Sequence, residues 1–167
     1  VEHLASLRAI PGLVMLRPGD ANEVVEAYRY LMPLRHEPEV LVLLRHPLPT
    51  LDRNTYAPAS GVARGAYVLG DAPGGNPEVI LIASGSEVSV AVEAHEKLVA
   101  EGIRSRVVSM PSWDIFEQQT QEYQESVLPP HVTARVAVEQ ASTFGWERYI
   151  GRAGRMIGMH TFGASAP

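Results

Sequence analysis

Residues 79–94, VILIASGSEVSVAVEA, place a run of β-favouring apolar residues directly before a small, glycine-bearing turn and a helical pattern. Strand–turn–helix units of this kind build open α/β sheets, and some of them hold a nucleotide phosphate at the start of the helix. Ser84 is predicted to be the helix N-cap, with Glu87 as its capping-box partner, and Gly102 to end the helix. One apolar face of this helix is predicted to comprise Val88, Ala91, Val92, His95, Leu98 and Val99.

The turn itself is predicted to be a structural connection rather than a nucleotide site. It lacks the G-x-G-x-x-G pattern, and it lacks the Gly-Lys-Ser/Thr ending of a P-loop. Glu87 would stand in the first helical turn, where its carboxylate complements the positive end of the helix dipole and repels a phosphate.

The same strand-then-helix rhythm runs along the rest of the chain. Helices are predicted at 20–32, where Asp20 and Glu23 form a capping box, in one segment rich in Glu and Gln that runs to residue 128, and at 145–151. The pattern as a whole indicates an α/β fold with a mostly parallel sheet flanked by helices. Strand 40–45 is apolar throughout, as expected of a parallel strand that is covered on both faces. The other strands are predicted at 13–17, 66–69, 104–110, 134–139 and 156–159.

Composition narrows the classes of partner. The formal net charge is -5 and the 14 basic residues are scattered, which argues against nucleic acid. No apolar run approaches the length of a membrane span, and no signal-peptide pattern is visible, so a cytoplasmic location is expected. The absence of cysteine excludes disulfides, thiolate metal sites and a cysteine nucleophile.

Familiar catalytic and metal motifs are missing. The six histidines show neither H-E-x-x-H nor H-x-H spacing, so no metal site is predicted, and His95 is expected to pack in the core. G-x-S-x-G is absent, and nothing in the spacing selects a glycosidase-like pair among the 19 acidic residues.

Arg45 is the residue that attracts a functional interpretation. It ends the apolar strand 40–45, and open parallel sheets bind ligands at the carboxyl ends of their strands. A guanidinium there suits a phosphate or a carboxylate, because it offers five donors in a planar fork. The alternative is an arginine that pairs with a neighbouring acid or extends to water.

Several long motifs resemble the C-terminal part of transketolase, in the order of that family. They are VEHLASLRAIPGL, RPGDANE, LPTLDR, ARGAYVL, VILIASGSEVSVAVEA, RVVSMPSWDIFEQQ, YQESVLPPHVTARVAVEQ and GWERYIG…IGMHTFGASAP. Transketolases are thiamine-diphosphate enzymes that move a two-carbon ketol unit between phosphorylated sugars. The resemblance runs almost from the first residue to the last.

The resemblance implies a domain division and a role for Arg45. Residues 1–51 would end the pyrimidine-binding domain, 52–64 would be a connector, and 65–167 would be the C-terminal domain, truncated at its end. Arg45 occupies the place of the family arginine that grips the sugar phosphate, in a strand followed by SRQNLP. His46 and Pro47 depart from the glutamine and asparagine of that motif.

The resemblance also implies what the chain leaves to other parts of the enzyme. The family's catalytic residues, its thiamine diphosphate site and its divalent cation (Mg or Ca) lie upstream, so no catalytic, cofactor-binding or metal residue is expected here. The whole enzyme would act on sugar phosphates in the pentose phosphate pathway as a homodimer. This chain, contributing Arg45 and dimer contacts, is expected to be inactive alone.

Two other interpretations remain open from the sequence. Residues 65–167 could be a non-catalytic α/β module for subunit contact or regulation, either as a separate subunit or as a proteolytic fragment. The chain could also match another thiamine enzyme, deoxyxylulose-phosphate synthase or a 2-oxo acid dehydrogenase β subunit. The motifs LPTLDR, SMPSWDIFE and GASAP favour transketolase over these two.

Overall fold

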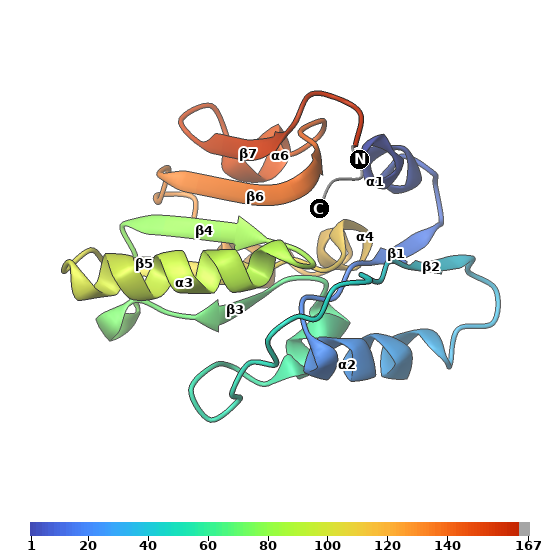
Figure 1. Ribbon diagram of the computed structural model, residues 1–167, viewed down its shortest axis with the longest axis horizontal. Coiled ribbons are helices and arrows are strands. Elements are labelled where there is room, and N and C mark those ends of the chain that lie inside the picture. The colour runs from blue at the N-terminus through green and yellow to red at the C-terminus, as the bar shows by residue number, and fades with distance from the viewer. Residues whose placement is uncertain (164–167) are drawn as a thin grey trace.

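A five-stranded sheet forms the centre of the computed structural model, which describes residues 1–163 (Figure 1). Its strands lie in the order β3-β5-β4-β6-β7, and all neighbours are parallel except β3, which runs antiparallel to β5. The predicted α/β fold with a mostly parallel sheet is therefore confirmed. The strands are β3 (Tyr67–Gly70), β4 (Val79–Ala83), β5 (Ser105–Ser109), β6 (Arg135–Ser142) and β7 (Arg155–Met159). The predicted C-terminal domain, residues 65–167, ends at a residue that lies outside the described part of the chain.

Helices cover both faces of this sheet. Alternate residues of β4 point to opposite sides, so Leu81 joins the core beneath α3 and Ile80 joins the core beneath the other helices. The helices are α3 (Glu87–Ala100) on one face, and α4 (Trp113–Glu117), α5 (Gln121–Val127) and α6 (Glu147–Ile150) on the other. Two short 3₁₀ segments, η1 (Ala59–Arg64) and η2 (Pro73–Gly75), flank β3.

The N-terminal part adds a two-stranded parallel sheet beside the carboxyl ends of the main strands (Figure 1). The predicted strand 40–45 is wrong in length and in burial, because β2 stops at Leu41 and its residues are exposed or half-buried. Among the described strands it pairs only with β1, so its other edge is left without a strand neighbour. The elements are α1 (Glu2–Arg8), β1 (Val14–Leu16), α2 (Ala21–Leu31) and β2 (Glu39–Leu41).

Of the two predicted capping boxes, the first forms with its return bond at Gly19, one residue before the cap, and the second does not form. Asp20 caps α2 by accepting from the Glu23 N–H at 2.8 Å, and the Glu23 carboxylate reaches back to the Gly19 N–H at 2.7 Å. Helix α3 instead begins at Glu87, and Ser84 does not cap it. The Ser84 hydroxyl is engaged by groups far away in the sequence, which outcompete the local cap.

Two arginines, at the amino ends of the two strands that flank β4, secure the end of α5. Arg106 and Arg135 both lie opposite Ile80, so they share one face of the sheet. Arg106 donates to the Ser126 carbonyl at 2.7 Å, and Arg135 donates to the Pro129 carbonyl at 2.8 Å. These guanidinium groups satisfy carbonyls that the end of a helix leaves without partners. The predicted helical region before residue 128 is thus split into α4 and α5.

Candidate functional site

The carboxyl ends of β4 and β6 mark the point at which the sheet changes its winding direction. From β4 the chain passes through α3 to β5, whereas from β6 it passes through α6 to β7 on the opposite side. Open α/β sheets bind their ligands at such a switch point. In this chain the N-terminal segment, residues 1–20, lies against that edge (Figure 1).

Arg17 fills the turn between β4 and α3. Its Nη1 donates to the Ser84 carbonyl at 2.6 Å and to the Glu87 carboxylate at 2.7 Å. Gly85 has φ +57°, and a Cβ there would lie 2.4 Å from Arg17 Cζ, so glycine is required by both the backbone and the space. The turn between β4 and α3 therefore holds an arginine of the same chain.

Glu139, near the carboxyl end of β6, binds the second arginine. Its two oxygens accept from Arg8 Nη1 at 2.7 Å and Nη2 at 2.6 Å, and the Trp146 indole N–H donates to it at 3.0 Å. Burial raises the pKa of the Glu139 carboxyl, but the hydrogen bonds and charge of Arg8, with Ser84 and Arg17, outweigh burial and lower the pKa overall. Glu139 is therefore held as a buried carboxylate.

Glu23 of α2 is also buried, but it contacts hydroxyl groups of β3 and β5 rather than an arginine. It accepts from the Tyr67 hydroxyl and from the Ser109 hydroxyl, both at 2.6 Å, and the side chain is 1% exposed. Burial raises the pKa of Glu23, and the opposing hydrogen bonds from Ser109, Tyr67 and the Gly19 N–H do not cancel this effect. Since no described cation forms an ion pair with it, ionising this carboxyl is unfavourable in the folded chain.

Glu23→Gln is expected to flatten the dependence of stability on pH. Above the ordinary carboxyl pKa, folded Glu23 keeps its proton longer than the unfolded chain does, so the free energy of unfolding falls as pH rises through that window. The amide carries no charge and lacks this slope. Urea unfolding of the variant between mildly acidic and neutral pH checks this.

Glu26→Gln is the matched control, because Glu26 lies on the same helix and pairs with the exposed Arg29. The control is expected to follow the wild-type profile. A Glu23→Gln variant that loses stability in parallel with the wild type as pH rises would contradict the assignment.

Arg45 lies in the loop after β2. The loop is tied at one end by the Val42 N–H, which donates to the Leu16 carbonyl at 2.8 Å, and at the other by the Leu51 N–H, which donates to Asp20 at 3.0 Å. Arg45 itself is exposed and, within residues 1–163, has no hydrogen-bond or ion-pair partner. It is therefore free to meet an anion. A hollow of about 270 Å³ beside it is lined by Pro18, Asp20, Ala21, Val24, Leu43, Leu44, His46 and Leu48.

Asp20, the acidic residue that lines this hollow, already forms an ion pair with Arg53. Asp20 is 3% exposed, and Arg53 donates to both of its oxygens, at 2.9 and 3.0 Å. The hollow therefore combines apolar walls with a compensated carboxylate, and two of its lining residues, Leu44 and His46, are the chain neighbours of Arg45.

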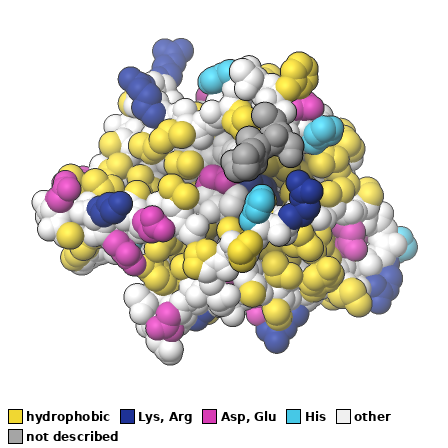
Figure 2. Space-filling view, in the orientation of Figure 1, with side chains coloured by type: hydrophobic (Ala, Val, Ile, Leu, Met, Phe, Trp, Pro, Cys, Tyr) yellow, Lys and Arg dark blue, Asp and Glu magenta, His cyan; other side chains and the backbone are white. Residues whose placement is uncertain are grey.

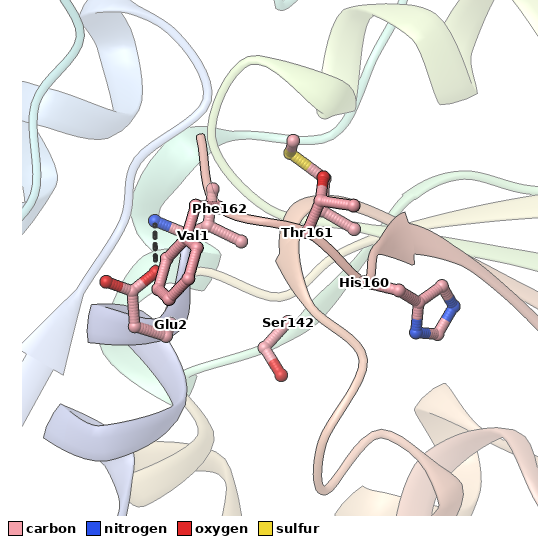
Figure 3. Close-up of a pocket in the computed structure, with 7 residues that line it drawn as sticks. Val1, Glu2, Ser142, His160, Thr161 and Phe162 are labelled. Atoms are coloured by element: carbon pink, nitrogen blue, oxygen red, sulfur yellow. Dashed lines mark ion pairs between the residues drawn. The ribbon is translucent and has the colours of Figure 1, made fainter. Parts of the chain in front are cut away.

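Other candidate groups are engaged or isolated. His95 is buried, and its Nδ1 lies 2.7 Å from the Ser105 hydroxyl, so the predicted packed histidine is confirmed. Within residues 1–163 no three acidic or histidine side chains come together as a metal site, and no described helix has the length and apolarity to cross a membrane. A further hollow of about 390 Å³ lies between Val1, Glu2, Ser142 and residues 159–162 (Figure 3).

Comparison with known proteins shows to which family the chain belongs. Residues 65–167 match the family model described as the transketolase-like TK C-terminal domain. The chain belongs to the transketolase family. Among curated relatives, it is 52% identical to the transketolase of Halalkalibacterium halodurans and 50% identical to that of Geobacillus stearothermophilus, over all of its length and 25% of theirs. It thus spans about a quarter of these transketolases and corresponds to their C-terminal part.

Solved structures agree. A transketolase from Leishmania mexicana superimposes with a TM-score of 0.90 at 41% identity, covering all of this chain and 23% of that one. A transketolase of Pichia stipitis in complex with sedoheptulose-7-phosphate gives a TM-score of 0.85 at 38% identity, covering 97% of this chain and 23% of that one. The resemblance to transketolase seen in the sequence motifs is confirmed.

Reasoning from the sequence missed the arginine–carboxylate pairs of this transketolase-family fold. The signal that selected Arg45, a charged residue ending an apolar strand, also applies to Arg17 after β1 and to Glu139 in β6. Arg8 carried no comparable signal, because its partner is 131 residues away in the sequence.

Proposed function

We propose that this chain forms part of a transketolase and that its Arg45 binds the phosphate group of a sugar-phosphate substrate. The supporting observation is an exposed arginine, without a carboxylate partner in residues 1–163, in the loop whose residues Leu44 and His46 line an apolar hollow. A planar guanidinium can donate two parallel N–H bonds to phosphate oxygens, which would hold the sugar in one orientation. The complex of the Pichia stipitis relative with sedoheptulose-7-phosphate supports this class of substrate.

The proposed activity of the whole enzyme is transfer of a two-carbon ketol unit between sugar phosphates of the pentose phosphate pathway, with thiamine diphosphate and Mg²⁺ or Ca²⁺. The described residues do not fit that cofactor. Arg17 and Arg8 fill the switch point of the main sheet, and no group of metal-binding side chains forms within residues 1–163. We therefore assign the cofactor and the catalytic residues to other parts of the enzyme and expect this chain to be inactive alone.

The proposed partner is the rest of the transketolase, or a second copy in a homodimer. Apolar side chains on and near α2 support a protein partner, and Figure 2 shows hydrophobic side chains over β1, β2 and α2. These exposed side chains are Val25, Tyr28, Met32 and Leu43. The domain division at residues 51 and 64 and a cytoplasmic location remain predictions.

Arg45→Ala tests the proposal in an active context. The chain can replace the matching quarter of the Geobacillus stearothermophilus transketolase, with which it shares 50% identity. In this chimera the substitution is expected to raise KM for a sugar phosphate by about ten- to a hundredfold, the range for losing charge-assisted hydrogen bonds. KM for an unphosphorylated ketol donor is expected to change little. Steady-state kinetics with both substrates checks this.

Arg152→Ala is the matched control, because Arg152 is also an exposed arginine but precedes β7 of the main sheet, whereas Arg45 follows β2 of the small sheet. An active chimera in which Arg45→Ala leaves both KM values unchanged would rule out the phosphate role. It would favour the alternative of a non-catalytic module for subunit contact.

A further inference from the structure

The carboxyl edge of β4 and β6 is built to bind guanidinium groups. Glu87 and Glu139 present two largely buried carboxylates there, and Ser84 adds a hydroxyl and a carbonyl between them. Two guanidinium groups balance these charges one for one. A hollow of about 280 Å³ is lined by Glu87, Glu139 and residues of β6 and β7, and the Glu139 side chain itself is fully buried.

The geometry selects a planar fork rather than an ammonium group. Arg8 donates two N–H bonds to the two oxygens of Glu139, and its Cζ lies 4.1 Å from the ring centroid of Trp113. Bidentate pairing and stacking on an aromatic face both require the flat, delocalised cation of arginine. A lysine ammonium supplies the charge without this shape.

We propose that Ser84, Glu87, Glu139 and Trp113 form a guanidinium-binding site at the switch point of the sheet, and that Arg8 and Arg17 occupy it as an internal ligand. Occupation fastens the N-terminal segment to the main sheet. Because Arg17 precedes Gly19 and Asp20, which hold α2 and the end of the Arg45 loop, the site also positions that loop. This last consequence rests on the proposed function of Arg45, whereas the guanidinium site does not.

Arg8→Ala with added methylguanidinium tests the site on the chain itself. The substitution removes both N–H bonds of Arg8 to the buried Glu139 carboxylate and leaves Arg17, at 3.9 Å, as its remaining cation, so we expect Tm to fall by roughly 10 °C. Millimolar methylguanidinium is expected to restore Tm in a saturable manner, and methylammonium or sodium chloride is not. The wild type is expected to show no such response, because its site is filled.

Tryptophan fluorescence gives a second, local measurement. Both tryptophans of the chain flank Arg8: the ring centroids of Trp113 and Trp146 lie 4.1 and 5.7 Å from its Cζ. Methylguanidinium that takes the place of Arg8 is therefore expected to change their emission, with the same saturation curve as Tm. Arg29→Ala, at an exposed arginine of α2, is the control and should show neither effect.

Arg8→Lys keeps the test decisive if the alanine variant does not fold. It retains the charge and the stem, and it is expected to melt clearly below the wild type because the fork is lost. An Arg8→Lys protein as stable as the wild type, or an alanine variant that methylguanidinium and sodium chloride stabilise equally, would overturn the proposal.

Discussion

Gly65→Ala is expected to destabilise the chain by about 3–5 kcal/mol. Gly65 ends η1 with φ +81°, and a Cβ there would lie 2.2 Å from the Phe116 nitrogen and 2.5 Å from the Ser112 carbonyl oxygen. Both neighbours are backbone atoms of α4 and its N-cap, and the Ser112 N–H donates back to the Gly65 carbonyl at 2.9 Å. Since neither can move without breaking this connection, overpacking adds to the strain of a positive φ.

Gly74→Ala separates these two contributions. Gly74 has φ +77°, but nothing lies within 4 Å of its ideal Cβ position, so only the strain of about 1 kcal/mol should appear. Urea unfolding of both variants measures the difference. Equal losses in the two variants would mean that η1 and α4 do not approach each other as closely as described.

Trp146→Ala is expected to cost about 3–5 kcal/mol, the range for deleting a fully buried aromatic side chain. Trp146 is 0% exposed, and its ring meets that of Trp113 edge to face, with centroids 4.9 Å apart. It also packs on Tyr149, with centroids 6.0 Å apart, and donates its N–H to Glu139. Truncation would remove the centre of the aromatic cluster beneath the main sheet.

Two further substitutions divide this effect. Trp146→Phe keeps an aromatic ring but removes the hydrogen bond to Glu139, so a smaller loss of roughly 1–3 kcal/mol is expected. Phe144→Ala, two residues earlier and 73% exposed, should change the free energy of unfolding by less than about 0.5 kcal/mol. Thermal and urea unfolding check all three, and a Phe variant as unstable as the Ala variant would refute the packing account.

Local patterns in the sequence predicted most of the elements. The period of apolar residues in α3 predicted its inward face: Val88, Ala91, Val92 and His95 are buried, whereas Leu98 and Val99 in the last turn are half-buried. The Asp20–Glu23 capping box formed because both partners lie within one helical turn. Strand 40–45 was overestimated, since an apolar run shows the capacity for burial but not which neighbour provides it.

The functional residues were only partly accessible in the same way. Arg45 was selected by its place after an apolar strand and by family resemblance, and its role stays a prediction. The Ser84 cap failed because the hydroxyl met Arg17, 67 residues away, instead of its own helix. No spacing rule could have paired these residues.

By itself, the sequence determined the α/β class and the family, because periodicity, caps and motifs act over short stretches of chain. Only the tertiary structure decided that Arg8 and Arg17 occupy the edge where such sheets bind ligands. The reason is physical: buried carboxylates need a partner of opposite charge, and the order of the strands determines which arginine reaches them.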